Sequence, residues 1–126
     1  TASGWTVNNS IEPGVGFFVN SQTTYTNTYV GELAANAGES VTNSLPEGVL
    51  VMVGSPLPYA GNMDDPILGL TTVPNKSNAQ FWDGSGYVSS TKTSTGWSGN
   101  PAISVAQGFF INSKTAYDWV QTAPAN

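Results

Sequence analysis

An internal repeat limits the possible folds of this 126-residue chain more than any other feature. Residues 4–25 (the first repeat) and residues 96–117 (the second repeat) align without a gap at an offset of 92, and 11 of the 22 aligned positions are identical. Each repeat starts with Gly-Trp and contains a Gly-Phe-Phe run. Such self-similarity predicts two copies of one supersecondary unit with the same backbone trace. The long offset indicates a chain that begins late in one unit and contains the next unit nearly whole.

The residues between the two repeats predict β-structure. Gly48–Gly54 is a continuous apolar run of strand length, and Thr26–Leu33 is rich in β-branched and aromatic residues. Ala79–Asp83 and Gly86–Thr91 are typical of a hairpin, whereas helical patterns are scarce. We therefore expect an all-β fold for residues 1–126. It would be a single sandwich or barrel-like domain of about 8–10 short antiparallel strands with an internal pseudo-repeat.

Composition excludes several classes of function. The chain has no Cys, no His and no Arg, and its only cationic side chains are three Lys. The missing Cys and His exclude thiolate and zinc sites, haem ligation and most nucleophile–base pairs. A net charge of −5 without Arg argues against nucleic acid as a partner.

The eight carboxylates offer little further chemistry. A glycosidase needs two of them on opposite sides of a sugar bond, and no spacing singles out such a pair. Asp64, Asp65 and Asp83 lie in turn-like segments and are candidate Ca²⁺ ligands, although Asp in turns usually serves the turn itself. We therefore predict no catalytic activity and no cofactor.

The polar residues indicate an exported protein. Ser, Thr and Asn form about a third of the chain, and only 9% of the residues are charged, against roughly 25% in an average soluble domain. The start at Thr1 is typical of a processed product or a portion of a longer chain. No apolar run approaches the ~20 residues that cross a bilayer. We expect an extracellular or cell-surface location without membrane insertion. The sequons at Asn8 and Asn75 are candidate glycosylation sites, or chance occurrences in a chain rich in Asn, Ser and Thr.

Several motifs resemble those of a known family. They are the Gly-Trp and Gly-x-Gly-Phe-Phe elements, Val-Gly-Glu at 30–32, Asn-x-Leu-Pro-x-Gly at 43–48 and aromatic-x-Gly-x-Gly-Tyr at 82–87. Together they resemble the repeated units of uncharacterised secreted bacterial β-proteins, and the resemblance covers most of the chain. It implies a β-fold and export. It implies no activity, because none is assigned to that family.

The apolar runs predict contacts between subunits. Successive side chains of a strand point to opposite faces, so Phe17 and Phe18 cannot both enter one core, and the apolar run 49–53 poses the same problem. Either loops of the same chain or another subunit cover the second face. The Gly before each Phe-Phe suits a bulge or a close backbone approach. The candidate interface residues are Phe17, Phe18, Val49, Val51 and Val53.

The start of the first repeat strengthens the expectation of assembly. The second repeat follows the hairpin of residues 81–91, whereas only three residues precede the first repeat. An unpaired strand edge invites another strand, so we expect a strand or hairpin from the next subunit, repeated head to tail into a filament. The alternative is that Thr26–Leu33 or the strand Tyr117–Thr122 covers the edge within one chain.

These observations favour a non-catalytic extracellular structural protein. It would self-assemble as a homopolymer, in the form of a filament, tube or surface layer. The alternative is a secreted carbohydrate-binding module that binds polysaccharide through exposed aromatic side chains, with Tyr59 and Tyr87 as glycan contacts. Trp5 and Trp97 occupy equivalent repeat positions, which favours a core role for both.

Overall fold

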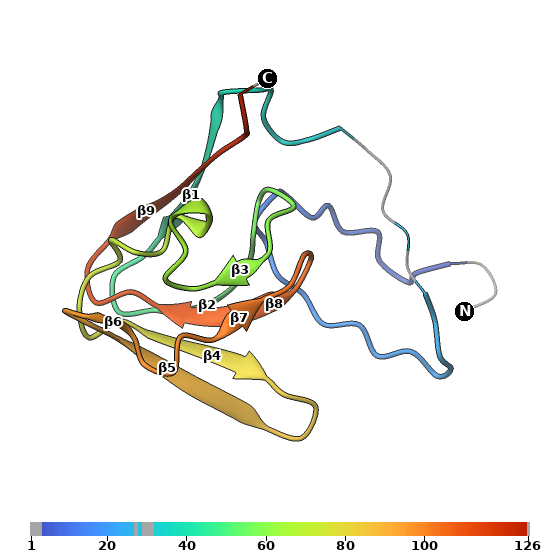
Figure 1. Ribbon diagram of the computed structural model, residues 1–126. Helices are drawn as coiled ribbons and strands as arrows, with labels where there is room; N and C mark the ends of the chain where they lie inside the picture. Colours follow the sequence, from blue (N-terminus) through green and yellow to red (C-terminus); the bar gives the residue numbers. More distant parts are fainter. Residues whose placement is uncertain (1–3, 27, 29–31, 126) are drawn as a thin grey trace.

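The computed structural model describes residues 4–26, 28 and 32–125. Within them the chain forms nine strands and one short 3₁₀ helix (Figure 1). The elements are β1 Ser40–Leu45, β2 Leu50–Gly54, β3 Gly61–Asn62, η1 Pro66–Leu68, β4 Asn78–Trp82, β5 Tyr87–Thr93, β6 Gly96–Trp97, β7 Ala102–Ile103, β8 Gly108–Asn112 and β9 Tyr117–Thr122. All of the strand pairs are antiparallel. The prediction of an all-β, sandwich-like fold is confirmed.

The strands form one five-stranded sheet and two two-stranded ribbons. The order in the sheet is β2-β8-β4-β5-β6, and the ribbons pair β1 with β9 and β3 with β7. Two strands adjacent in the sheet, β4 and β5, form the predicted hairpin, with Trp82 opposite Tyr87 at the turn. The second repeat supplies β8, which lies between β2 and β4.

One face of the sheet packs against the ribbons and the segment between them, and this contact forms the core. The sheet contributes Val53, Ala79, Phe81, Phe109 and Ile111. The opposite layer contributes Leu45, Met63, Leu68, Leu70, Val73, Ile103 and Trp119. Phe109 has a central position, because its ring stacks on Phe81 at 5.2 Å and lies 5.9 Å from the ring of Trp119.

Buried polar groups in the core are hydrogen-bonded. Gln121 of β9 is buried, and its Oε1 accepts hydrogen bonds from Ser55 Oγ at 2.9 Å and from the Leu57 N–H at 3.2 Å. Its Nε2 donates to the carbonyl of Leu68 at 3.3 Å. Among the described residues no buried side-chain nitrogen or oxygen lacks a partner. Gln121 therefore ties β9 to two loops that carry few regular backbone hydrogen bonds.

The Gly-Trp motif of the second repeat anchors a loop. Gly96 has φ 133°, and its Cα lies against Asp64, so that a Cβ at this position would be 2.6 Å from Asp64 Oδ2. The Asp64 carboxylate accepts the Trp97 N–H at 3.0 and 3.1 Å, and Trp97 Nε1 donates to the carbonyl of Leu70 at 3.1 Å. The motif thus needs glycine for its backbone and for the close approach.

The two repeats differ in structure, so the prediction of one shared backbone trace is wrong. The second repeat forms β6, β7, β8 and the start of β9, whereas the first repeat contains no strand and one isolated bridge, Val15 to Val53. Trp97 is 3% exposed but Trp5 is 82% exposed. The physical reason is that β8 has a partner strand on each side, while the first repeat forms a single bridge, at the outer edge of β2.

The strand predictions elsewhere are mostly confirmed. β2 lies within Gly48–Gly54, and β9 has the expected bounds but pairs with β1, so it does not cover the edge of the first repeat. The sequence did not reveal β1, because its polar residues lack an apolar run. Thr26–Leu33 shows no strand at residues 26, 28, 32 and 33, and its other residues lie outside the described part of the chain.

Candidate interaction surface

The face of the five-stranded sheet opposite the core carries a row of aromatic rings, which we call the outer face. Phe110 of β8 lies 5.8 Å from Tyr87 of β5, and Tyr87 lies 5.1 Å from Trp82 of β4, measured between ring centroids. Trp82 and Tyr87 are about half exposed, at 51% and 48%. Trp82 and Phe110 point outward because each follows a core side chain, Phe81 or Phe109, and strand side chains alternate. Tyr87 shares their face because it lies opposite Trp82 across the hairpin.

Residues 14–18, which we call the edge segment, run along the outer edge of β2 beside this row. Val15 lies opposite Val53 in an antiparallel bridge. The Gly54 N–H donates to the carbonyl of Gly14 at 3.0 Å, and the Gly16 N–H donates to the carbonyl of Met52 at 3.4 Å. The edge segment is therefore joined to β2 through one antiparallel bridge.

Gly16 and Phe18 fit the edge segment to the outer face. A Cβ on Gly16 would lie 2.7 Å from Met52 Cγ and 3.0 Å from the Val53 carbonyl oxygen, so the predicted close backbone approach is present here. The ring of Phe18 lies 6.1 Å from that of Phe110, which extends the aromatic row from the sheet onto the edge segment.

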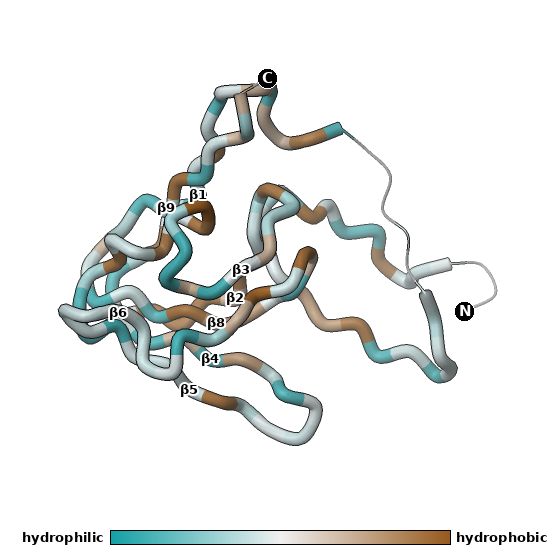
Figure 2. Tube along the Cα trace, in the orientation of Figure 1, coloured by the Kyte–Doolittle hydropathy of each residue, from teal (hydrophilic) through white to brown (hydrophobic). Residues whose placement is uncertain are grey.

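The first repeat exposes many large apolar side chains. Figure 2 shows apolar residues along this part of the chain, which extends away from the sheet. The exposed residues are Trp5, Val7, Ile11, Val15, Phe17, Phe18, Val19 and Tyr25. Monomeric soluble proteins rarely expose large contiguous apolar patches, and such patches mark interaction sites.

The predicted interface residues differ in exposure. Phe17, Phe18 and Val49 are exposed, as an interface residue must be before assembly. Val53 is buried in the core and Val51 packs against it, so neither presents an exposed apolar side chain, and their part in an interface stays a prediction. The β2 residues on the outer face are Leu50 and Met52. The sequence could not show which alternate residues of β2 face the core, because all five residues of 49–53 are apolar.

Leu50, Met52, Trp82 and Phe110 were absent from the predicted sites. The signal that identifies them is alternation along each strand once the pairing of β2 with β8 and of β8 with β4 is known. Sequence alone does not supply that pairing, because the strands are distant along the chain.

The two candidate glycan contacts lie in different environments. Tyr87 is on the outer face, whereas Tyr59 is half-buried against the core and donates its hydroxyl to the carbonyl of Thr122 at 2.7 Å. The rings of Tyr87 with Trp82 and of Tyr87 with Phe110 both meet at 65°, so they share no plane. The sequon residues Asn8 and Asn75 are exposed.

The candidate Ca²⁺ ligands bind backbone groups of their own turns and strand ends. Asp83 Oδ1 accepts the N–H of Ser85 at 2.8 Å, that of Gly86 at 2.9 Å and the Ser85 hydroxyl at 3.0 Å. These bonds, led by the Ser85 N–H, lower the pKa of Asp83. Asp64 accepts the Trp97 N–H, and Asp65 accepts that of Asn62 at 2.8 Å. Within the described part of the chain, no three carboxylates group as a metal site would need.

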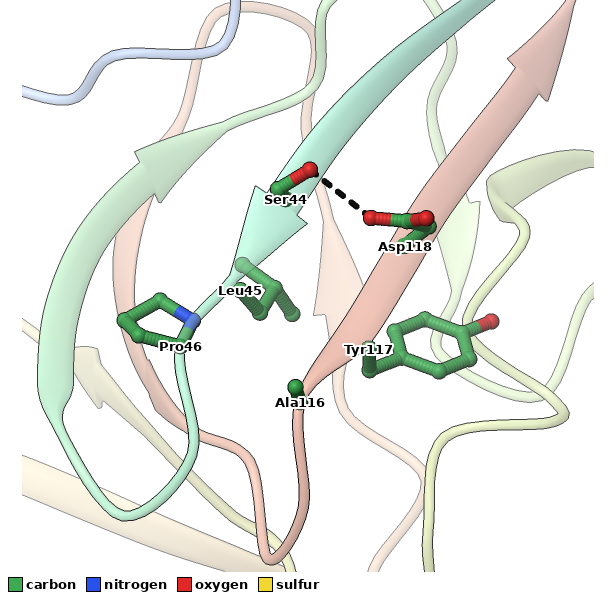
Figure 3. Close-up of a pocket in the computed structure, with 6 residues that line it drawn as sticks. All are labelled: Ser44, Leu45, Pro46, Ala116, Tyr117 and Asp118. Atoms are coloured by element: carbon green, nitrogen blue, oxygen red, sulfur yellow. Dashed lines mark hydrogen bonds between the residues drawn. The ribbon is translucent and has the colours of Figure 1, made fainter.

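Two open hollows lie away from the outer face. One, of about 320 Å³, lies between β1 and β9 (Figure 3), where Ser44 Oγ donates to Asp118 Oδ1 at 2.7 Å. Its lining residues are Ser44, Leu45, Pro46, Ala116, Tyr117 and Asp118. The other, of about 570 Å³, is lined by Glu32, Leu33, Ala35, Asn36, Ala37, Ala123 and Pro124. Each hollow contains one carboxylate, whereas glycoside hydrolysis ordinarily requires two.

The chain matches no protein-family model, no curated protein and no solved structure. In the residues that the structure describes, no helix is long and apolar enough to cross a membrane. The exposed apolar surface of the first repeat and the outer face are the features of this chain that indicate a function.

Proposed function

We propose that this protein is a non-catalytic, extracellular structural protein whose subunits assemble with one another. The main support is the exposed apolar surface of the first repeat beside the aromatic row. Burying one such side chain fully is worth roughly 1.5–3 kcal/mol. Eight large apolar side chains of the first repeat are exposed, so a partner that covers part of this surface gains substantial free energy.

The repeat supports another subunit as that partner. Residues 16–20 read Gly-Phe-Phe-Val-Asn, and β8 reads Gly-Phe-Phe-Ile-Asn. β8 pairs with β2 on one side and with β4 on the other. The chain therefore contains two copies of one strand sequence, residues 16–20 and β8, and also the strands with which this sequence pairs. Every further subunit offers the same sequence and the same pairing strands.

The charge distribution also favours association of like subunits. No charged residue occurs among the side chains that alternate onto the outer face from β2, β8, β4 and β5. The first repeat contains one charged residue, Glu12. Depletion of charge is typical of the buried centre of protein interfaces, and two uncharged surfaces do not repel.

Carbohydrate binding is the second candidate function. The observation in its favour is the pair of half-exposed rings, Trp82 and Tyr87, on a sheet face that also carries the amide of Gln80. Titration with polysaccharides while Trp fluorescence is recorded tests it, with Trp82→Ala as the control variant. Binding that Trp82→Ala abolishes supports this candidate, and an unchanged spectrum across the polysaccharides contradicts it.

Sedimentation velocity over a range of concentrations, with electron microscopy of the same samples, tests the assembly proposal. We expect the unmodified protein to form polymers and the double variant Phe17→Asp, Phe18→Asp to remain a folded monomer. Val120→Asp is the matched control, because Val120 is an exposed apolar residue of β9 in the β1–β9 ribbon, outside the proposed surface. A protein that stays monomeric at high concentration contradicts the proposal.

A further inference from the structure

We propose that the edge segment of one subunit pairs with the outer edge of β2 in a second subunit. There it replaces the second subunit's own edge segment. This inference rests on the proposed function and adds the surface, the register and the partner. The occupant is a second copy of this chain, exchanging residues 14–18.

The contacts within one chain define the register of the exchanged strand. The two hydrogen bonds, Gly54 N–H to Gly14 and Gly16 N–H to Met52, flank the pair Val15 and Val53. This is the non-hydrogen-bonded arrangement of an antiparallel ladder, in which the facing side chains come closest. Continued along β2, this register places Phe17 opposite Val51 and Phe18 opposite Leu50.

The ladder within one chain is short. Among the described residues, its backbone hydrogen bonds end at Gly16, and Leu50 remains 46% exposed. Two hydrogen bonds contribute only about 0.5–1.5 kcal/mol each. Asn43 Nδ2 adds a hydrogen bond to the Gly14 carbonyl at 3.1 Å, and the Phe18 ring lies 6.1 Å from that of Phe110. These contacts are few, and an edge strand with free N–H and C=O groups accepts another strand.

Exchange between subunits repeats the same contacts without the constraint that the segment return to β1 of its own chain. Residues 19–26, 28 and 32–39 form no helix or strand. A hydrogen bond from Asn43 Nδ2 of β1 to the Gly14 carbonyl, at 3.1 Å, joins the edge segment to β1. A segment from another subunit can continue the ladder past Gly16 and cover Leu50. Swapping an identical element costs few contacts. Each subunit donates at one site and accepts at another, so the contact propagates head to tail.

Engineered cysteines test the exchange, because the chain has no Cys of its own. Val15→Cys and Val53→Cys are made as separate single variants, labelled with different affinity tags, mixed and oxidised. We expect disulfide-linked heterodimers that carry both tags. The double variant Val15→Cys, Val53→Cys should form a ladder of linked subunits on a non-reducing gel.

The pair Ser40→Cys and Thr122→Cys is the matched control. These two side chains face each other across β1 and β9, with their hydroxyl oxygens 2.7 Å apart. They belong to the ribbon and should link within one chain only. If the Val15 and Val53 cysteines also link only within one chain, or do not link at all, the exchange is refuted. If polymers still form in that case, the proposed function stands and the contact between subunits lies elsewhere. If the protein is a monomer, the proposed function and the exchange are both refuted.

A second pair of variants avoids the buried Val53. Phe18→Glu and Phe110→Lys each place a charge where the two rings meet, 6.1 Å apart in the native chain. Each variant alone should sediment as a monomer. The mixture should assemble, because the carboxylate introduced at position 18 of one variant then meets the ammonium group introduced at position 110 of the other. Failure of the mixture to assemble, while each variant is folded, contradicts the exchange.

Discussion

Replacing Phe109 with alanine should destabilise this protein far more than the same change at Phe17, its equivalent in the first repeat. Phe109 is 1% exposed and packs between Phe81 and Trp119, whereas Phe17 is 45% exposed. Truncating a buried Phe to Ala costs about 3–5 kcal/mol, and a surface substitution usually changes stability by no more than about 0.5 kcal/mol. Total stabilities are only about 5–15 kcal/mol, so the two variants are easily separated.

Urea and thermal denaturation, followed by Trp fluorescence, measure the difference at concentrations where both variants are monomeric. A loss of 1 kcal/mol lowers Tm by about 4–8 °C in domains of 60–100 residues and by about 2–4 °C in domains of 150–250 residues. At 126 residues, Phe109→Ala should therefore lower Tm by about 10 °C or more. Phe17→Ala should leave Tm nearly unchanged and weaken assembly instead. An equal loss of monomer stability in both variants would refute the argument, because it would mean that the first repeat has a core like that of the second.

Three further changes test individual contacts. Gly96→Ala should cost about 1–3 kcal/mol in urea denaturation, and more than Gly84→Ala, because both glycines have positive φ but only at Gly96 would the Cβ meet a neighbour, Asp64. Gln121→Leu should cost about 1–3 kcal/mol by the same measurement, because it leaves the buried Leu57 N–H without an acceptor; unchanged stability would contradict the role assigned to that amide. The lowered pKa of Asp83 means that its turn is stabilised above the ordinary Asp pKa and loses this contribution as the pH falls through the folded-state pKa. NMR titration should give a pKa below the ordinary value, and Ser85→Ala, which removes the hydroxyl bond, should raise it.

Local sequence was sufficient for the elements whose determinants are close together in the chain. The hairpin of β4 and β5 was predicted because Asp83-Gly84 specifies the turn and apolar residues flank it. Its structure shows why, since Asp83 binds the N–H groups of the next residues. Composition likewise excluded thiolate, imidazole and phosphate-binding chemistry without any knowledge of the fold. The alternation of Phe109 and Phe110 between two faces follows from strand geometry alone.

Long-range packing decided the rest. The Trp of Gly-Trp and the first Phe of Gly-Phe-Phe are buried in the second repeat and exposed in the first, because burial depends on which strands lie alongside, and only β8 has both β2 and β4 as neighbours. The choice of which β2 residues face the core has the same origin. An all-apolar run fits either face of a sheet, and the pairing of Val53 with Phe109 selects which residues enter the core. The aromatic row exists only because strands far apart in the sequence are adjacent in the sheet. Sequence thus determined the hairpin of β4 and β5, the apolar strand β2 and the chemistry available to the chain. Tertiary contacts determined which apolar side chains stabilise the core and which remain on the surface.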